Sequence, residues 1–491
     1  MGKRKKHADV AGPASVTTAK GKKRVKTSAD SPHISARTQQ PNAVKRLQAI
    51  AAGAERLWQE AVAARTPIVI EGELKDKEWL ASCKWSNDYL RSTAGTCKIL
   101  VEQKFGDNGA FGKGRKVHMT FGELVQQLQQ GNDSLYLTTQ ETGVDAAGLP
   151  NIMAPPVSRL RQDFPVRPEC MGCLIPQQIN LWMGAARNGA SSGLHHDFHD
   201  NLYILLRGRK RFRLYPPSEA PHMYTHGHLK KIYPNGRIVY AGQGMVLEDG
   251  SDTSEVRRWQ QEQAVEAELA AAEEGVTAGA KGAKGRLARA EQAFEALLDA
   301  QLRCRQHDPG EDGCSGSEGF PADLQDDYID SDADDIDSND SQQAVLSLQS
   351  RLNPGQACEG LGLGVQQGAS RSPTTKQLVW ESVIDDSNPP SFSQVDLSSL
   401  TETELCMQFP MFPAASKCYE CELSAGEQLY LPCGWFHEVR SYGDSQQGGH
   451  LALNYWFHPP DNLDPSLEAM QSPYRSKYWS DLWTRRGMVL S

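Results

Sequence analysis

The sequence predicts a mainly β fold with flanking helices, and three observations support this class. Short apolar runs separated by Gly-rich turns follow one another from Ile179 to Tyr215. After a long polar interruption, the residues from Tyr419 to Pro432 and from Gly449 to Phe457 again alternate like strands. Segments with helical spacing precede and follow these strand-rich blocks.

Two helices and two strands are predicted ahead of the first block. A helix from about Ala43 to Ala64 has its apolar residues at helical spacing, namely Leu47, Ile50, Ala54, Leu57 and Val62. Pro67–Ile70 is predicted as a buried strand, Phe121–Gln130 as a short helix ending at Gly131, and Leu135–Leu137 as another strand.

Residues 1 to about 42 contain few large apolar side chains, so we expect a disordered tail. Two basic clusters, Lys3–Lys6 and Lys20–Lys26, are typical of nuclear import signals and also fit contact with nucleic acid. The alternatives are a merely solvated tail or an organelle transit peptide. The eleven cysteines are scattered and the chain has no apolar run that could span a bilayer, which favours an intracellular protein with free thiols and no membrane contact. We expect the nucleus, with the cytoplasm as an alternative.

Residues 247–395 interrupt the strand pattern. The Ala/Glu-rich stretch from Glu255 to Leu302 has good helix formers but also several glycines. The run from Asp323 to Asp340 holds nine Asp and no Lys or Arg, and such blocks repel one another and stay solvated. The Gly-rich stretch 360–364 has no helix signal after it and is not a nucleotide-binding loop. We interpret the whole segment as a mostly disordered acidic insert.

A final helix is predicted from Ser472 to Arg486, with Pro473 in its first turn. Its aromatic face should pack on the core, and pairing of two subunits is the alternative. The resulting division of the chain is a tail (1–42), a supporting region of helix and strand (43–165), the first half of the core (166–246), the insert (247–395), the second half of the core (396–465) and a C-terminal helix (466–491).

The spacing of His195 and Asp197 predicts a metal centre. On a strand, side chains two apart lie on the same face, so these two can reach one ion whereas His196 cannot. Two histidines and one carboxylate suit non-haem Fe(II), because this facial set leaves positions open for a co-substrate and dioxygen. The third ligand is expected from the second strand block, where His437 follows a Pro/Gly turn.

Lys210 shares the apolar face of its strand with Phe212 and Leu214. A buried lysine needs an anion, which a dicarboxylate co-substrate chelating the iron at its other end would provide. A protein carboxylate, or a lysine stem that reaches outward, is the alternative.

Two CxxC pairs, Cys170/Cys173 and Cys418/Cys421, suggest zinc at first sight. The second pair lies in a predicted strand, where residues three apart face opposite sides. Free thiols are therefore the preferred interpretation.

Five stretches together resemble the JmjC branch of the cupin-type 2-oxoglutarate oxygenases, and within it the small JmjC-only proteins that hydroxylate protein side chains. These stretches are Leu194–Asp197, Asn201–Tyr203, Gly208–Pro217, Leu431–His437 and Leu453–Trp456. The resemblance implies a double-stranded β-helix core, with Fe(II) held by His195, Asp197 and His437.

The same resemblance implies that Lys210, Ser192 and Tyr136 hold the distal carboxylate of 2-oxoglutarate. Asn201 and Asn454 are then expected near the end of the co-substrate that binds iron. Trp182 and residues near His199 are expected in the substrate pocket, and His196 and His199 as neighbours of the cavity rather than ligands.

The favoured function is therefore a dioxygenase that uses Fe(II), 2-oxoglutarate and O2 to hydroxylate a lysyl or similar protein side chain, releasing succinate and CO2. A JmjC-type N-methyl demethylase of proteins or histones is the first alternative. A non-catalytic cupin that binds partners, and an oxygenase acting on a small molecule or nucleic acid, are the others.

Overall fold

The computed structural model describes residues 40–51, 53–104, 115–145, 149–187, 189–306 and 388–487. The predictions for the basic clusters of the tail, for the acidic run 323–340 and for the Gly-rich stretch 360–364 lie outside these residues. In the described part of the chain, no helix is long and apolar enough to cross a membrane.

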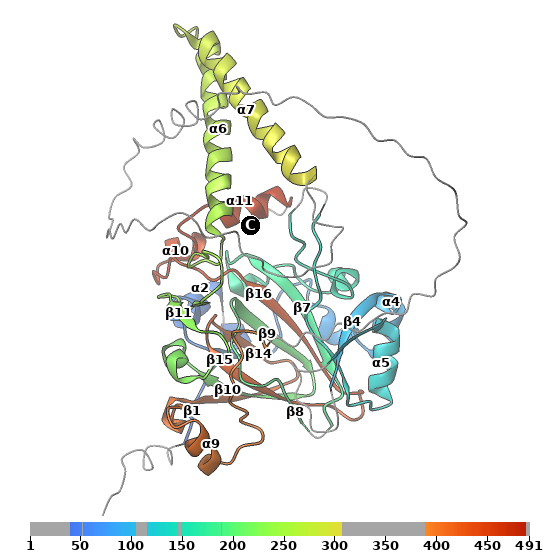
Figure 1. Ribbon diagram of the computed structural model, residues 1–491. Coiled ribbons are helices and arrows are strands. Elements are labelled where there is room, and N and C mark those ends of the chain that lie inside the picture. Colours follow the sequence, from blue (N-terminus) through green and yellow to red (C-terminus); the bar gives the residue numbers. More distant parts are fainter. Residues whose placement is uncertain are drawn as a thin grey trace, which may run out of the picture.

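Two mixed sheets face each other and form the core (Figure 1). Among the described residues, the larger sheet has the spatial order β2 (Lys45–Gln48), β3 (Ile68–Glu71), β14 (Gln428–Leu431), β9 (Asp200–Arg207), β16 (His450–Phe457), β7 (Pro176–Gly184), β6 (Leu135–Leu137), β4 (Lys98–Gln103) and β5 (Arg115–Thr120). The smaller sheet has the order β1 (Asn42–Ala43), β13 (Tyr419–Ser424), β10 (Arg209–Tyr215), β15 (Phe436–Tyr442) and β8 (Ala190–Ser191). Strands β11 (Leu229–Ile232) and β12 (Ile238–Tyr240) form a separate ribbon. The predicted mainly β core of the double-stranded β-helix type is confirmed.

The space between the sheets is filled by residues that alternate along their strands. Leu429 and Leu431 of β14 and Phe212 and Leu214 of β10 point into it, together with Tyr203. The chain passes from β9 to β10 at Gly208, whose φ is +84°. A Cβ there would lie 2.6 Å from the Tyr442 carbonyl oxygen, so only glycine makes this tight link between the sheets.

The other face of the larger sheet is covered by helices. These are α2 (Ala54–Leu57), which continues into a π-helical turn (Trp58–Val62), α3 (Ala81–Lys84), α4 (Asn87–Ala94), α5 (Phe121–Gln129), α10 (Leu467–Gln471) and α11 (Tyr478–Arg485). Helix α9 (Glu402–Gln408) lies instead near β1, and its Leu405 packs against the cluster that contains Tyr215 and Phe436 (Figure 1). A capping box of Thr120 and Glu123 begins α5, close to the predicted start. Its buried Phe121, Leu124 and Leu128 join the core on this face.

The predicted helix from Ala43 to Ala64 is wrong in its first half. Asn42–Ala43 and Lys45–Gln48 are strands that pair in parallel with β13 and β3, respectively. The backbone groups at the edges of these sheets need partners, and this tertiary demand overrides the helical spacing. A short 3-10 helix (Ala49–Ala51) follows β2, and α-helical structure begins only after Gly53, at Ala54.

The predicted final helix is also shorter than expected. The segment from Ser472 to Lys477 is not helical, and α11 begins at Tyr478. Tyr474 lies in the non-helical link and fixes it: its hydroxyl donates to the His458 carbonyl oxygen (3.0 Å) and accepts from the Ile175 backbone N–H (3.0 Å). Tyr478 and Trp483 are buried, in agreement with packing on the core.

The segment predicted as a mostly disordered insert contains two long helices, α6 (Thr253–Thr277) and α7 (Ala283–Gln306). They form a hairpin that projects from the β core (Figure 1). Asp252 caps α6, and Arg286 of α7 makes a bidentate ion pair with Glu268 (2.7 Å for both contacts). The helix formers therefore outweigh the glycines here. Residues 307–387 lie outside the described residues.

Candidate metal centre

His195, Asp197 and His437 are brought together, with their ligand atoms all within 4.8 Å of one another. In the described part of the chain no other group of this kind is found. His195 and Asp197 lie just before β9, and His437 is the second residue of β15. The two-residue spacing has the expected effect, because His196 points the opposite way and bonds the Tyr240 hydroxyl at 2.7 Å.

The two imidazoles are oriented by backbone carbonyls. Nδ1 of His195 lies 3.0 Å from the Gly193 oxygen, and Nδ1 of His437 lies 2.9 Å from the Trp435 oxygen. A carbonyl only accepts, so both Nδ1 atoms carry the proton and both Nε2 lone pairs are left for a metal. Burial and the neighbouring His437 lower the pKa of His195 to about 4, which keeps the ring in the neutral form that a metal requires.

The donor set fits iron. Asp197 Oδ2 lies 3.8 Å from His437 Nε2, so the carboxylate faces the same point as the two free imidazole nitrogens. Two imidazoles and one carboxylate on one side of an ion form the facial set of non-haem Fe(II) centres.

Phe392 covers the imidazole of His195. The two rings are stacked, with centroids 4.6 Å apart and planes inclined by 10°. Phe392 belongs to a segment that runs beside both Leu194–His196 and Tyr224–Gly227: the Ser393 N–H donates to the Leu194 oxygen (2.8 Å) and the His226 N–H to the Phe392 oxygen (2.9 Å). Residues 388–395 thus pack on the core, although the sequence pattern placed them in the insert.

A cavity between the sheets adjoins the three ligands. Its lining includes these predicted residues: Tyr136, Trp182, Ser192, His195, Asp197, Asn201, Lys210 and His437. Its apolar wall is formed by Leu429, Leu431 and Phe212. One cavity therefore joins most of the residues that the sequence singled out.

Lys210 is 1% exposed, and its Nζ donates to the Ser441 hydroxyl at 2.6 Å. Its ammonium lies 6.0 Å and 5.8 Å from the ring centroids of Tyr136 and Tyr203. No carboxylate of the described residues forms an ion pair with it, so the protein-carboxylate alternative finds no support. Burial lowers the pKa of Lys210 to about 7. An anion in the cavity would offset that burial.

The other predicted polar residues form a network along the cavity. Asn454 donates to Asn201 Oδ1 (3.0 Å) and accepts from Trp182 Nε1 (2.8 Å), which fixes the amide of Asn201 at the cavity wall. The Ser192 hydroxyl accepts from the Val439 N–H (3.0 Å) and donates to the Gly193 oxygen (2.9 Å). Asn454 itself is fully buried and lies behind the lining residues.

His199 is not part of the cavity lining. Its ring stacks on Trp456 at 5.9 Å and meets His458 edge-on at 6.1 Å. Trp456 in turn contacts Trp182 at 6.3 Å, so His199 is linked to the cavity only through two aromatic rings. Burial lowers its pKa to about 4.

Ser441 was missed in the sequence, although a signal for it exists. His437, Val439 and Ser441 are two residues apart on β15 and all line the cavity, so the period of a strand could have identified Ser441. Phe392 has no such signal, because nothing in its sequence neighbourhood links it to His195.

The CxxC pairs do not form a zinc site. The described cysteines are free, and they do not gather into a metal-binding group. Burial raises the pKa of the Cys421 thiol, which is the expected state of a thiol in a core.

Comparisons with known proteins show the family of this chain. Residues 54–463 match the model of the cupin-like domain family. The chain is 32% identical over 419 residues to JmjC domain-containing protein 4 of Schizosaccharomyces pombe, a match that covers 82% of each chain. It is 27% identical over 173 residues to the human bifunctional peptidase and (3S)-lysyl hydroxylase JMJD7 (33% of this chain, 52% of the relative). It is 45% identical over 103 residues to the lysine-specific demethylase JMJ32 of Arabidopsis thaliana (21% of this chain, 25% of the relative). With its His–Asp–His set in a cupin core, this chain belongs to the JmjC-domain proteins of the cupin-like family.

Proposed function

We propose that this protein is an Fe(II)- and 2-oxoglutarate-dependent dioxygenase that hydroxylates a protein side chain, lysyl or similar. One observation carries the proposal: a complete His–Asp–His set and a buried lysine without a carboxylate partner share one cavity. A scaffold that only binds partners has no physical need for both, so the non-catalytic cupin is disfavoured.

The residues present divide into two groups by role. His195, Asp197 and His437 would hold the iron, and the carbonyls of Gly193 and Trp435 would keep both imidazoles in the right tautomer. Iron at this position supplies an oxidation of a C–H bond by O2, coupled to conversion of 2-oxoglutarate into succinate and CO2.

The second group would hold the co-substrate. Lys210, supported by the Ser441 hydroxyl, would bind the distal carboxylate by a charge-assisted hydrogen bond, with Tyr136 and Ser192 beside it. Asn201, fixed by Asn454, would face the end of the co-substrate nearest the metal. The apolar wall of Leu429, Leu431 and Phe212 would exclude water from the reacting atoms.

The class of substrate is supported by the relatives. A human relative is named as a lysyl hydroxylase, which favours a lysyl side chain. Other relatives are named lysine-specific demethylases, so removal of an N-methyl group is the second candidate. The same oxidation on an N-methyl carbon gives an unstable alcohol and releases formaldehyde. Another relative is named as a tRNA wybutosine-synthesizing protein. A nucleic-acid substrate is therefore a further outcome that the test has to distinguish. Nuclear localisation and contact of the basic tail with nucleic acid stay predictions.

Succinate formation tests the activity. Purified protein is incubated with Fe(II), ascorbate, 2-oxoglutarate and air, and succinate is measured beside a His195→Ala control. We expect turnover that the control lacks and that peptides containing lysine stimulate. A mass gain of one oxygen on the peptide identifies hydroxylation, and formaldehyde identifies demethylation. A protein that binds neither iron nor 2-oxoglutarate would instead be a non-catalytic cupin.

A further inference from the structure

The metal centre depends on two segments that are far apart in the chain. One runs from Asp197 to Asp200 and leads into β9, and the other is the turn Pro432–Trp435 that leads into β15 and His437. They meet directly where the Gly434 N–H donates to the Asp197 carbonyl oxygen (2.9 Å). Any relative shift of these segments would change the distance between Asp197 and His437.

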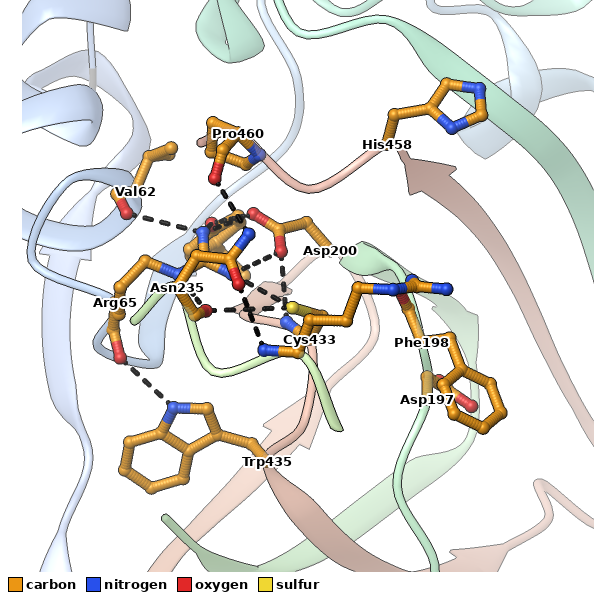
Figure 2. A network of polar contacts seen from close by, with 12 residues as sticks. Val62, Arg65, Asp197, Phe198, Asp200, Asn235, Cys433, Trp435, His458 and Pro460 are labelled. Atoms are coloured by element: carbon orange, nitrogen blue, oxygen red, sulfur yellow. Dashed lines mark hydrogen bonds and ion pairs between the residues drawn. The ribbon is translucent and has the colours of Figure 1, made fainter. Parts of the chain in front are cut away.

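A buried ion pair joins the two segments a second time (Figure 2). Arg65 makes a bidentate contact with Asp200, with its two terminal nitrogens 2.7 Å and 2.6 Å from the carboxylate oxygens. Asp200 also accepts from the Cys433 backbone N–H (3.0 Å) and from the Tyr430 hydroxyl. The Asp200 carboxylate thus forms hydrogen bonds to Arg65, to the turn at Cys433, and to Tyr430 of β14, the strand that precedes the turn.

Arg65 is itself fixed from several sides. Its Nε donates to the Asn235 carbonyl oxygen (2.8 Å), and one terminal nitrogen lies 3.3 Å from Cys433 Sγ. Its own carbonyl accepts from the indole N–H of Trp435 (3.1 Å). The residue has φ of +49°, a conformation that non-glycine residues rarely adopt. This single residue therefore contacts both ends of the turn before His437.

The ion pair between Arg65 and Asp200 is unusual because both side chains are largely buried. The Asp200 side chain is 0% exposed and that of Arg65 is 11% exposed. Burial opposes the charge on Arg65, but Asp200 holds its pKa well above the ordinary value. An ion pair in such a place is weak evidence for stability, because desolvation offsets much of the attraction. Its bidentate geometry instead fixes the relative position of the segments that the ion pair joins.

We propose that Arg65 and Asp200 are positioning residues of the metal centre, which hold the Asp197 segment against the turn that carries His437. Neither residue belongs to the His–Asp–His set or lines the cavity. The proposal rests on the proposed function, because it assumes that the three ligands bind a metal. It assigns a role to the N-terminal supporting region, which contributes Arg65 but no ligand.

The test compares metal affinity with stability. Arg65→Met removes the charge and keeps the stem, Arg65→Lys keeps the charge but not the bidentate fork, and Tyr430→Phe removes one hydroxyl. Each full-length variant, freed of metal, is titrated with Co(II) as a probe, and its visible spectrum and thermal unfolding are recorded. We expect the Co(II) dissociation constant of Arg65→Met to rise about 10–100-fold, the usual effect of losing a residue that orients metal ligands. Arg65→Lys should recover part of the loss, and Tyr430→Phe should show a smaller one.

Asp163→Asn provides a matched control. Asp163 is also a buried carboxylate, with Lys84 (2.9 Å), the Trp85 indole (3.0 Å) and the Tyr89 hydroxyl (2.8 Å) as partners, but it does not line the cavity. This variant should unfold at a lower temperature and bind Co(II) like the wild type.

The outcomes separate the two proposals. If Arg65→Met and Tyr430→Phe lose stability but keep the wild-type Co(II) affinity and spectrum, the pair is merely structural and the positioning role is refuted. If Arg65→Met does not fold, the same comparison of Co(II) affinity with stability is made for Tyr430→Phe and Arg65→Lys. Wild-type protein that binds Co(II) but never turns over 2-oxoglutarate would refute the proposed function alone. Wild-type protein without Co(II) binding would refute both.

Discussion

His195 and His437 are paired by their backbones as well as by their side chains. The His195 N–H donates to the His437 oxygen at 3.1 Å, and the His437 N–H donates to the His195 oxygen at 2.6 Å. Residues paired in this way on adjacent strands have side chains on the same face, and the two ring centroids lie 4.3 Å apart. This isolated antiparallel bridge between a loop residue and β15 thus sets the distance between two metal ligands.

Loss of one ligand should abolish metal binding. His195→Ala or Asp197→Ala leaves two donors, which cannot form the facial set, so neither variant should retain metal at micromolar concentrations. The bound metal is measured after gel filtration by elemental analysis. His222→Ala is the control, because His222 is partly exposed, pairs with Glu219 and does not line the cavity. Stoichiometric iron in either ligand variant would refute the proposed set.

Lys210→Met should weaken 2-oxoglutarate binding and leave metal binding intact. A charge-assisted hydrogen bond in a buried site contributes about 1.5–3 kcal/mol, which corresponds to a rise of about 10–150-fold in the dissociation constant. Ser441→Ala removes only a neutral partner of Lys210 and should cost about fivefold or less. Calorimetric titration of the metal-loaded protein with 2-oxoglutarate measures the dissociation constant of each variant. An unchanged constant in Lys210→Met would show that the co-substrate binds elsewhere.

Co-substrate binding should depend on pH through Lys210. Its pKa is lowered by burial to about 7, and a bound carboxylate favours the charged form. The affinity should therefore be highest at and below about pH 7 and should fall as the pH rises above it, with proton uptake on binding. Titrations in buffers of different ionisation enthalpy detect that uptake, and Lys210→Arg, which stays charged, should abolish it.

The stability of the ligand-free protein should follow the opposite trend. Because the folded pKa of Lys210 lies below the unfolded value of 10.5, the unfolded chain binds the proton more readily between about pH 7 and pH 10.5. The contribution of Lys210 to the free energy of unfolding should rise with pH across that window. Comparison with Lys210→Met by denaturant unfolding isolates this contribution; parallel pH profiles would contradict the lowered pKa.

Removal of Phe392 should loosen the metal centre. The stacked pair with His195 is worth about 0.5–1.5 kcal/mol beyond simple burial, so Phe392→Ala should raise the Co(II) dissociation constant by about 2–10-fold and lower the unfolding temperature. Phe409→Ala is a suitable comparison, because Phe409 packs edge-on against Tyr224 at 5.0 Å and away from the cavity. Phe409→Ala should lower the unfolding temperature and leave the Co(II) dissociation constant unchanged.

The base of the hairpin should depend on one aromatic contact. Trp259 of α6 meets Tyr478 of α11 edge-on at 5.8 Å, and the Tyr478 hydroxyl donates to Glu255 (3.1 Å). Trp259→Ala should speed proteolytic cleavage within α6 and α7, since local opening there becomes easier. Metal affinity should not change. Cleavage at the wild-type rate would mean that other contacts hold the hairpin.

The strands and the metal site could be predicted because their signals are local. Alternation identified the strands around Leu202 and Leu429, and a spacing of two placed His195 and Asp197 on one face. The burial of Lys210 followed from its apolar neighbours on the same face. In each case the residues that carry the signal are adjacent in the chain.

The missed features all depend on contacts between distant segments. Asn42–Gln48 is extended because β13 and β3 offer free edges, which nothing in that heptapeptide reveals. Arg65 contacts Asp200 and Cys433, and nothing in its sequence neighbourhood indicates these partners. Phe392 was assigned to the insert because the residues before it are polar. Packing between remote parts of a chain leaves no periodic trace in the sequence.

The hairpin and the segment with Phe392 have an evolutionary consequence. The chain leaves the core at Asp252, the cap of α6, and has rejoined it by Pro390, whose carbonyl oxygen accepts from the Gly227 N–H. The entropy of closing a loop grows only slowly with its length, so additions or deletions between these two anchors cost the core little. Natural selection can therefore lengthen, shorten or replace this stretch almost independently of the metal centre.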